Sequence, residues 1–181
     1  MNASKIRGKI LRVLWAAGKP MTLQGIAEKA GLTSSSTTEY LSELIKAKYV
    51  SAPKEQYYAI TNLGKQALGL PKLDKKLALN ILTPVSLEKA FHFYYGLNQY
   101  SGVYADSLKD FVDKIQKVDL KCIEFHIPRK DFELWIRSLG DLELSKKLEL
   151  LRMKPLSGEN LRKELYETVN SRYEELNRLT V

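Results

Sequence analysis

A histidine, an arginine and an aspartate stand close together in the second half of this chain, as His126, Arg129 and Asp131. In an enzyme, His126 would act as a base oriented by the Asp131 carboxylate, while Arg129 would hold an anion. The same residues suit a polar junction between two helices, where they satisfy backbone groups. We favour the junction, with Pro128 marking a helix break, and we assign no catalytic residue.

The other residue patterns give little support for metal or cofactor chemistry. His92, Cys122 and His126 lack both a familiar spacing and a clear fourth metal ligand. The chain has no glycine-rich phosphate loop, no nucleophile motif and no His-Glu-x-x-His pair. We therefore expect no bound metal, no cofactor and no enzymatic activity.

A dense aromatic run lies upstream of this cluster. Its members are Phe91, Phe93, Tyr94, Tyr95, Tyr100 and Tyr104. We expect most of these rings in the core. As an alternative, they line a pocket for a small molecule, with His92 and His126 as its polar points. The C-terminal half would then sense a small-molecule effector.

Positive charge is concentrated in the first 70 residues. The chain has 181 residues and a net charge of +8, and residues 1–70 hold ten Lys and Arg against four Glu, an excess of six. A polyanion is attracted to such a surface, so this asymmetry favours nucleic acid as a partner of the N-terminal part.

Composition predicts a folded cytoplasmic protein. Hydrophobic residues make up 44% and charged residues 28% of the chain, and no apolar run reaches the roughly 18 residues of a membrane span. The early lysines are not followed by the apolar stretch of a signal peptide. Cys122, the single cysteine, cannot form an internal disulfide and fits a reducing compartment.

Residues 20–62 predict two helices followed by a hairpin. Thr22 can cap a short helix that ends at Gly31, and Thr33 can cap a second helix after a tight turn. The buried face of the second helix would comprise Thr37, Leu41, Leu44 and Ile45. Residues 49–52 and 56–60 then read as two strands, with a turn at 53–55.

This order of helix, turn, helix and hairpin resembles the winged helix-turn-helix domains of many archaeal and bacterial transcription regulators. The segment Ala-Ile-Thr-Asn-Leu-Gly-Lys-Gln-Ala-Leu, residues 59–68, is similar to the part of those domains that closes the wing and begins the last helix. The resemblance covers about residues 4–70. It implies that the second long helix enters the major groove of duplex DNA.

The residues expected to contact DNA lie on three elements. They are Lys5, Lys9 and Arg12 on a first helix predicted over residues 4–17, Ser34, Ser35, Ser36, Thr38, Glu39, Tyr40 and Lys46 on the reading helix, and Lys54 on the wing. Lysines and arginines bind phosphates without reading sequence. Hydroxyls at a helix start suit phosphates and base edges.

The reading helix also carries an argument against DNA. It lacks arginine, the usual partner of guanine, and Glu39 and Glu43 would repel phosphates unless they accept hydrogen bonds from cytosine amino groups. The alternative function is therefore a protein-interaction adaptor whose winged helix does not bind DNA.

The C-terminal half reads as helical after a connector at residues 71–85. Candidate helices cover about residues 86–97, 104–116, 119–126, 129–139, 141–152 and 157–179. Two strings, Ala90-Phe-His-Phe-Tyr-Tyr-Gly96 and Phe125-His-x-x-Arg-x-Asp-Phe-x-x-Trp135, resemble an uncharacterised and mainly archaeal family, DUF5752, through about residues 86–178. That family has no assigned reaction, so the resemblance implies a fold and no activity.

Together these observations predict a mainly α protein with a small β-wing. A winged helix-turn-helix domain would occupy residues 1–70, and an all-α domain would occupy residues 86–181. We expect a transcription regulator that binds double-stranded DNA, with a C-terminal domain for dimerisation or ligand sensing. A homodimer is expected because one module makes few base contacts. The apolar stripe along residues 157–179 is the candidate dimer surface.

Overall fold

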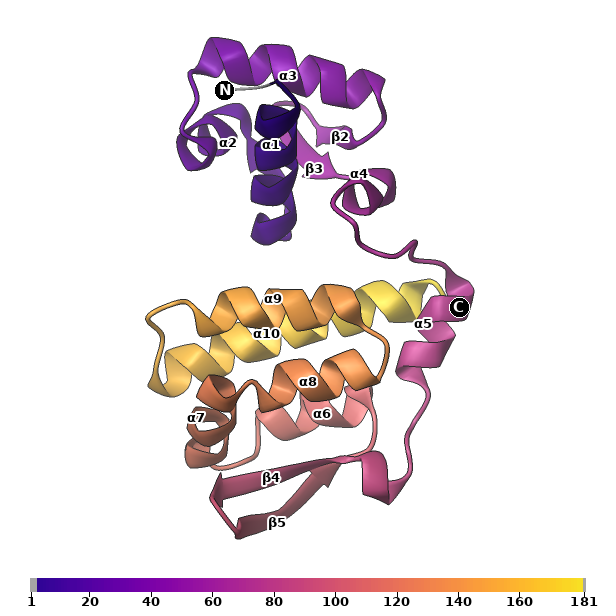
Figure 1. Ribbon diagram of the computed structural model, residues 1–181, viewed down its shortest axis with the longest axis vertical. Coiled ribbons are helices and arrows are strands. Elements are labelled where there is room, and N and C mark those ends of the chain that lie inside the picture. The colour runs from indigo at the N-terminus through magenta and orange to yellow at the C-terminus, as the bar shows by residue number, and fades with distance from the viewer. Residues whose placement is uncertain (1–2, 181) are drawn as a thin grey trace. The chain divides into compact units, whose positions relative to one another are not determined.

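The computed structural model describes residues 3–180 and divides the chain into two compact units. The first unit extends to Lys72, and the second begins at Leu73. Helices dominate both units, and each unit also contains a small antiparallel sheet (Figure 1). The predicted class, mainly α with a small β-wing, is confirmed.

Three helices build the first unit. They are α1 (Ala3–Ala17), α2 (Leu23–Ala30) and α3 (Ser34–Lys46), with α3 lying along one side of the unit in Figure 1. The Thr22 hydroxyl accepts from Gly25 N and begins α2, while Gly31 ends it in the left-handed conformation. Thr33 caps α3 in the same way through Ser36 N. All three terminal signals were predicted correctly.

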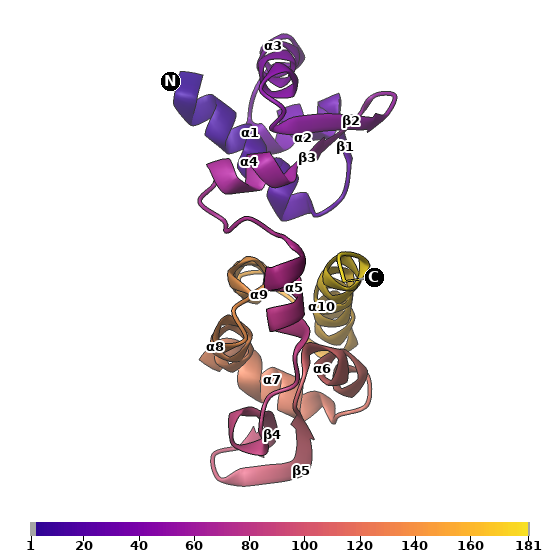
Figure 2. The same cartoon turned by 90° about the vertical axis from the view of Figure 1, so that its right-hand side faces the viewer.

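A three-stranded sheet forms the wing. Its strands β1 (Met21–Thr22), β2 (Val50–Lys54) and β3 (Tyr57–Ile60) lie in the order β1-β3-β2, and the β2–β3 hairpin extends to one side in Figure 2. Strand β1 was not predicted. The turn lies at Glu55–Gln56 instead of residues 53–55, because Lys54 still pairs with Tyr57 and Gln56 takes the positive φ of 62°.

The base of the wing is tied to the end of α3 through Thr61. The Thr61 hydroxyl lies 2.7 Å from the Lys48 carbonyl oxygen, and the Thr61 N–H donates to the Tyr49 carbonyl. The same hydroxyl accepts from Gly64 N and begins α4 (Asn62–Ala67). Because α4 approaches the Tyr49 carbonyl so closely, residue 64 has no room for a side chain.

The second unit contains both helices and a hairpin. Its helices are α5 (Lys75–Leu82), the 3-10 turn η1 (Leu87–Lys89), α6 (Leu108–Ile115), α7 (Leu120–Arg129), α8 (Asp131–Ser138), α9 (Leu142–Arg152) and α10 (Gly158–Arg178). Strands β4 (Phe91–Gly96) and β5 (Gln99–Ala105) form the hairpin along one edge of the helices (Figure 1).

The helix predicted over residues 86–97 is therefore wrong, and the second unit is not all-α. Phe91 and Phe93 are buried, whereas His92 and Tyr94, which alternate with them, are half-buried. This alternation has the two-residue period of a strand. Asn98 takes a positive φ of 58° at the hairpin turn. Helix α5 falls within the predicted connector, and its Ala78 and Ile81 belong to the core of the second unit.

Pro128 does not end a helix. Helix α7 continues through Arg129, and the break comes at Lys130, whose φ is 65°. A proline removes one backbone donor from a helix and crowds the carbonyl four residues earlier, so Pro128 costs α7 one hydrogen bond without ending the helix. The junction between α7 and α8 thus lies two residues beyond the predicted break.

A buried arginine ties α10 to the start of α9. Arg172 binds both Asp141 oxygens, at 2.7 and 3.0 Å, and also contacts Glu143 and Glu175 at 2.9 and 2.7 Å. Burial alone lowers the pKa of the Arg172 guanidinium. The charge and hydrogen bonds of Asp141, together with the charges of Glu143 and Glu175, outweigh the effect of burial and raise that pKa. Arg172 therefore remains charged inside the protein.

The apolar stripe of α10 packs inside its own unit. Leu161, Leu165, Val169 and Leu176 are all buried in the core, and Tyr173 packs against it. The proposed dimer surface along residues 157–179 is therefore wrong for this stripe, because the monomer already covers it.

We expect opposite effects from alanine at two helical glycines of the first unit. A Cβ at Gly64 would lie 2.2 Å from the Tyr49 carbonyl oxygen, so Gly64→Ala should lower the free energy of unfolding by about 1–3 kcal/mol. A Cβ at Gly8 meets nothing closer than 3.6 Å, so Gly8→Ala should raise that free energy by about 0.5–1 kcal/mol.

Native-state hydrogen exchange on the full chain measures both changes through the amides of α1 and α3. Equal protection in the two variants would contradict the close approach of α4 to Tyr49.

Candidate nucleic-acid interface

The two sides of α3 differ in chemistry. Thr37, Leu41 and Leu44 are buried against the first unit, and the side chains on the outside are exposed. The outer set comprises Ser34, Ser35, Thr38, Glu39, Ser42, Glu43 and Lys46. Ile45, predicted to be buried, is 38% exposed. A mostly polar ridge with one apolar residue near its end thus faces away from the core.

Hydroxyls crowd the first turn of α3, but several already have partners. Thr33 accepts from Ser36 N and donates to the Ser36 hydroxyl, while the Thr38 hydroxyl donates to the Ser34 carbonyl at 2.9 Å. Within the described chain, the hydroxyls of Ser34, Ser35 and Ser42 make no hydrogen bond. These serines are therefore the available donors of the ridge.

One of the two acids on α3 is neutralised from α1. The Arg7 guanidinium lies 2.9 Å from the Glu43 carboxylate, and both side chains remain nearly half exposed. A paired carboxylate repels a nearby phosphate far less than a free one does. Arg7 was not among the predicted site residues, because nothing in the sequence indicates that its side chain reaches α3.

The three cations predicted along α1 take different positions. Lys5 and Arg12 are exposed, and the Arg12 guanidinium lies back over Gly8 on the same helix. Lys9 is half-buried, and its ammonium lies beside Gly31 in the turn that leads to α3. A cation there also interacts favourably with the partial negative charge at the C-terminal end of α2.

Four further predicted residues lie beyond the first turn of α3. Lys46 is exposed at the end of α3, whereas Lys54 stands in the wing with its ammonium 5.8 Å from the centre of the Tyr57 ring. Tyr40 is half-buried and packs against the core, so its ring serves the fold more than the outer ridge. Glu39 is exposed and has no ion pair among the described residues.

The polar cluster of the second unit is a closed arrangement. Tyr94 N–H donates to His126 Nε2 at 2.9 Å, so this nitrogen carries no proton. The other ring nitrogen, Nδ1, then donates to Asp131 at 2.7 Å, and Arg129 binds the same carboxylate oxygen at 3.1 Å. Both nitrogens of His126 are occupied, and the ring is 4% exposed. In this arrangement neither nitrogen of the His126 ring is available as a base.

His92 does not belong to this cluster. Its Nε2 lies 3.0 Å from the Leu87 carbonyl oxygen, and its ring contacts Tyr100 and Tyr104. His126 instead packs against Phe91 and Phe93 on the core side of β4. Strand alternation separates the two histidines, so they do not line one pocket.

Metal-ligand groups do not converge within residues 3–180. No three His, Cys, Asp or Glu side chains there are arranged to hold an ion. Cys122 is buried, and burial raises the pKa of its thiol, which keeps the thiol protonated. Over the same residues, no helix combines the length and apolar character of a membrane span.

Comparison with known families agrees with both halves of this description. The model of the family of unknown function DUF5752 matches residues 88–180, about half of the chain. The chain belongs to the DUF5752 family. The model of the IclR helix-turn-helix domain matches residues 8–53, which include α2, the turn and α3. No curated protein and no solved structure matches the chain.

The recognition of both halves from sequence is thus confirmed, and the DUF5752 protein carries an IclR-type helix-turn-helix domain ahead of its family domain. The β4–β5 hairpin, the α7–α8 junction and the Arg172 network all lie within the part that matches DUF5752. The family description assigns no activity to them.

We expect His126 to make the stability of the second unit depend on pH. Burial lowers the pKa of His126 below 6.5, and the hydrogen bond to Asp131 does not compensate. The unfolded chain therefore binds a proton that the folded chain excludes. The contribution of the neutral His126 ring to the free energy of unfolding is complete above pH 6.5. It is lost as the pH falls towards the pKa of His126 in the folded chain, by up to about 1.4 kcal/mol per pH unit.

Unfolding free energies at pH 7.5 and 5.5 test this expectation in the wild type and in His126→Gln. The variant should be less stable at both pH values but lose less stability between them. His92→Gln controls for the loss of a histidine. Identical pH profiles in His126→Gln and the wild type would contradict the neutral, buried imidazole.

Proposed function

We propose that this protein is a transcription regulator that binds duplex DNA through α3. The observation that carries this proposal is the outer ridge of α3, which bears available serine hydroxyls and has Glu43 neutralised by Arg7. The unit that presents the ridge holds an excess of six positive charges over residues 1–70. A helix with these properties suits the major groove, which admits one α-helix.

Each element of the first unit takes a defined role in this proposal. Lys5, Arg12, Lys46 and Lys54 contact phosphates and set the position of the domain without reading sequence. Ser35 and Ser42 contact base edges or phosphates from the ridge. Glu39, which has no cation partner, accepts from a cytosine amino group and gives the ridge its sequence preference.

The DUF5752 domain supplies dimerisation or ligand sensing in this proposal. Dimerisation is supported by the small number of base contacts that one module makes, since two tethered modules bind paired half-sites more tightly. The stripe of α10 is not the contact surface, because it is buried in the monomer. Light scattering of the purified chain measures the assembly.

DNA binding should depend steeply on salt. Four phosphate contacts per module predict a slope of about −3.6 in a plot of log K against log salt concentration, and an affinity loss of roughly 100-fold between about 50 and 200 mM salt. Fluorescence anisotropy with a labelled duplex measures the slope. Lys46→Gln and Lys54→Gln should each reduce its magnitude by about 1.

Lys76→Gln, an exposed lysine of α5, removes the same charge from the other unit and should leave the slope unchanged. Absence of binding at about 50 mM salt would overturn the proposal and support the protein-interaction adaptor.

The Arg7–Glu43 pair gives a second test. Arg7→Gln should weaken binding about 3- to 10-fold, because the released Glu43 carboxylate then repels phosphates. The double variant Arg7→Gln/Glu43→Gln should bind like the wild type, since it restores a neutral pair. A double variant as weak as Arg7→Gln would show that Arg7 contacts DNA directly and would contradict the neutralising role.

A further inference from the structure

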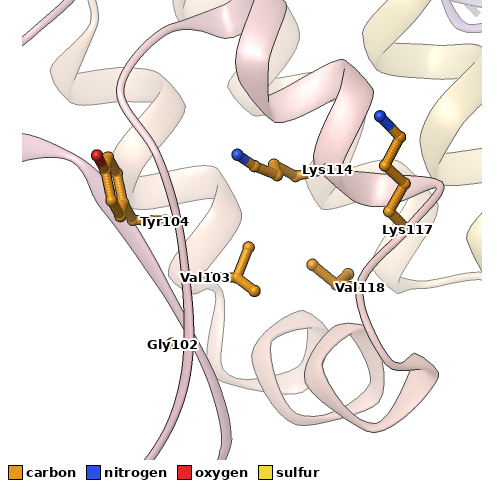
Figure 3. Close-up of a pocket in the computed structure, with 6 residues that line it drawn as sticks. All are labelled: Gly102, Val103, Tyr104, Lys114, Lys117 and Val118. Atoms are coloured by element: carbon orange, nitrogen blue, oxygen red, sulfur yellow. The ribbon is translucent and has the colours of Figure 1, made fainter.

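A pocket lies between strand β5 and the end of helix α6, outside both regions described above. Its volume is about 270 Å³, and its walls are Gly102, Val103, Tyr104, Lys114, Lys117 and Val118 (Figure 3). In this view the Lys114 ammonium is directed towards Tyr104. The side chains of Val103 and Val118 lie between strand β5 and the end of helix α6. This volume lies just below the roughly 300–1,000 Å³ of pockets for drug-sized ligands, which suits a smaller molecule with one ring.

An irregularity in the hairpin forms one wall of this pocket. His92 pairs with Tyr104 and Tyr94 pairs with Tyr100, so three residues of β5 stand opposite Phe93 alone. The Ser101 hydroxyl bridges the interruption, because it donates to the Phe93 carbonyl at 2.7 Å and accepts from Val103 N at 3.2 Å. Gly102 takes a φ of +80°, and a Cβ there would meet no atom within 4 Å. The bulge therefore leaves open space beside Tyr104.

An aromatic row runs along the outside of the hairpin and ends at the pocket. The ring of Tyr94 lies 5.4 Å from that of Tyr100, Tyr100 lies 5.6 Å from His92, and His92 lies 5.9 Å from Tyr104. Tyr104 is 41% exposed and has the Lys114 ammonium 6.0 Å from its ring centre. An exposed ring beside a cation presents both an apolar face and a positive charge to a ligand.

Positive charge at the pocket is local. Lys114 shares its charge with Asp110 at 3.2 Å, whereas Lys117 has no ion pair within the described chain. Helix α6 itself carries two lysines and two aspartates and is neutral overall. Such a surface lacks the extended field that attracts a nucleic acid, but it offers one net positive charge to a small anion.

We propose that this pocket binds a small molecule that consists of one planar ring and one anionic group, either a carboxylate or a phosphate. The ring lies against Tyr104 with its edge on Val103 and Val118, and the anion binds Lys114 and Lys117. This inference names a ligand class for the ligand-sensing part of the proposed function. It does not depend on DNA binding.

Calorimetric titration of the full chain tests the site with four probes: phenyl phosphate, benzoate, inorganic phosphate and phenol. At least one of the two ringed anions should bind once per chain and about tenfold more tightly than inorganic phosphate or phenol. The stronger ringed anion identifies the anionic group as phosphate or carboxylate.

Variants connect the binding to this pocket. Lys114→Gln and Lys117→Gln should each weaken it about tenfold, and Tyr104→Leu should weaken it while Tyr104→Phe preserves it. Lys121→Gln is the matched control, because this exposed lysine lies outside the pocket. Circular dichroism verifies that the variants fold, and the two lysine variants remain informative if Tyr104→Leu does not.

Three results would overturn the proposal: no saturable binding of either ringed anion, inorganic phosphate binding as tightly as phenyl phosphate, or equal losses in Lys121→Gln and the pocket variants. Anisotropy with duplex DNA, measured on the same protein, distinguishes the two proposals. Ligand binding without DNA binding contradicts the regulator alone, and DNA binding without ligand binding contradicts the pocket alone.

Discussion

The burial of one side of α3 determines what its other side can present. Thr37, Leu41 and Leu44 pack into the core of the first unit, and this fixes the rotation of the helix about its axis. A rotation of one residue, about 100°, would bury serines and expose leucines, so the core holds the ridge in place. The Arg7–Glu43 pair depends on the same constraint, since it forms where α1 and α3 are held together. The core thereby controls both the shape and the charge of the candidate DNA surface.

The second unit depends on a different kind of constraint, a charged group enclosed by protein. Arg172 is 3% exposed and Asp141 is 1% exposed, and Asp141 also accepts from Leu144 N to begin α9. Removing one partner of such a pair would leave a buried charge without compensation, which is strongly destabilising. The network therefore specifies how α10 packs against α9, and with it the burial of the apolar stripe of α10.

The parts of the fold that follow from local chemistry were predictable, and those that depend on tertiary neighbours were not. Caps at Thr22, Thr33 and Gly31 use atoms a few residues away, so the sequence alone indicates them. The hairpin at 91–105 was missed although Phe91 and Phe93 alternate with polar neighbours, because a short aromatic run fits a buried helix as well. Arg7 and Arg172 find their partners 36 and 31 residues away in the chain, across helix contacts that no spacing rule contains.

The polar cluster first considered as chemistry acts on the hairpin instead. A two-stranded sheet leaves unpaired donors along its outer edges, and an unsatisfied donor in a protein interior is costly. The His126 ring accepts the Tyr94 N–H on the edge of β4, and Asp131 holds the ring in the tautomer that can do so. Beside this fixed position, the pairing has three residues of β5 opposite Phe93, and Ser101 bridges that bulge. A neutral histidine on the core side of the hairpin thus supports β4, which pairs with the strand that carries Tyr104. This connects the DUF5752 polar junction to the wall of the candidate ligand pocket.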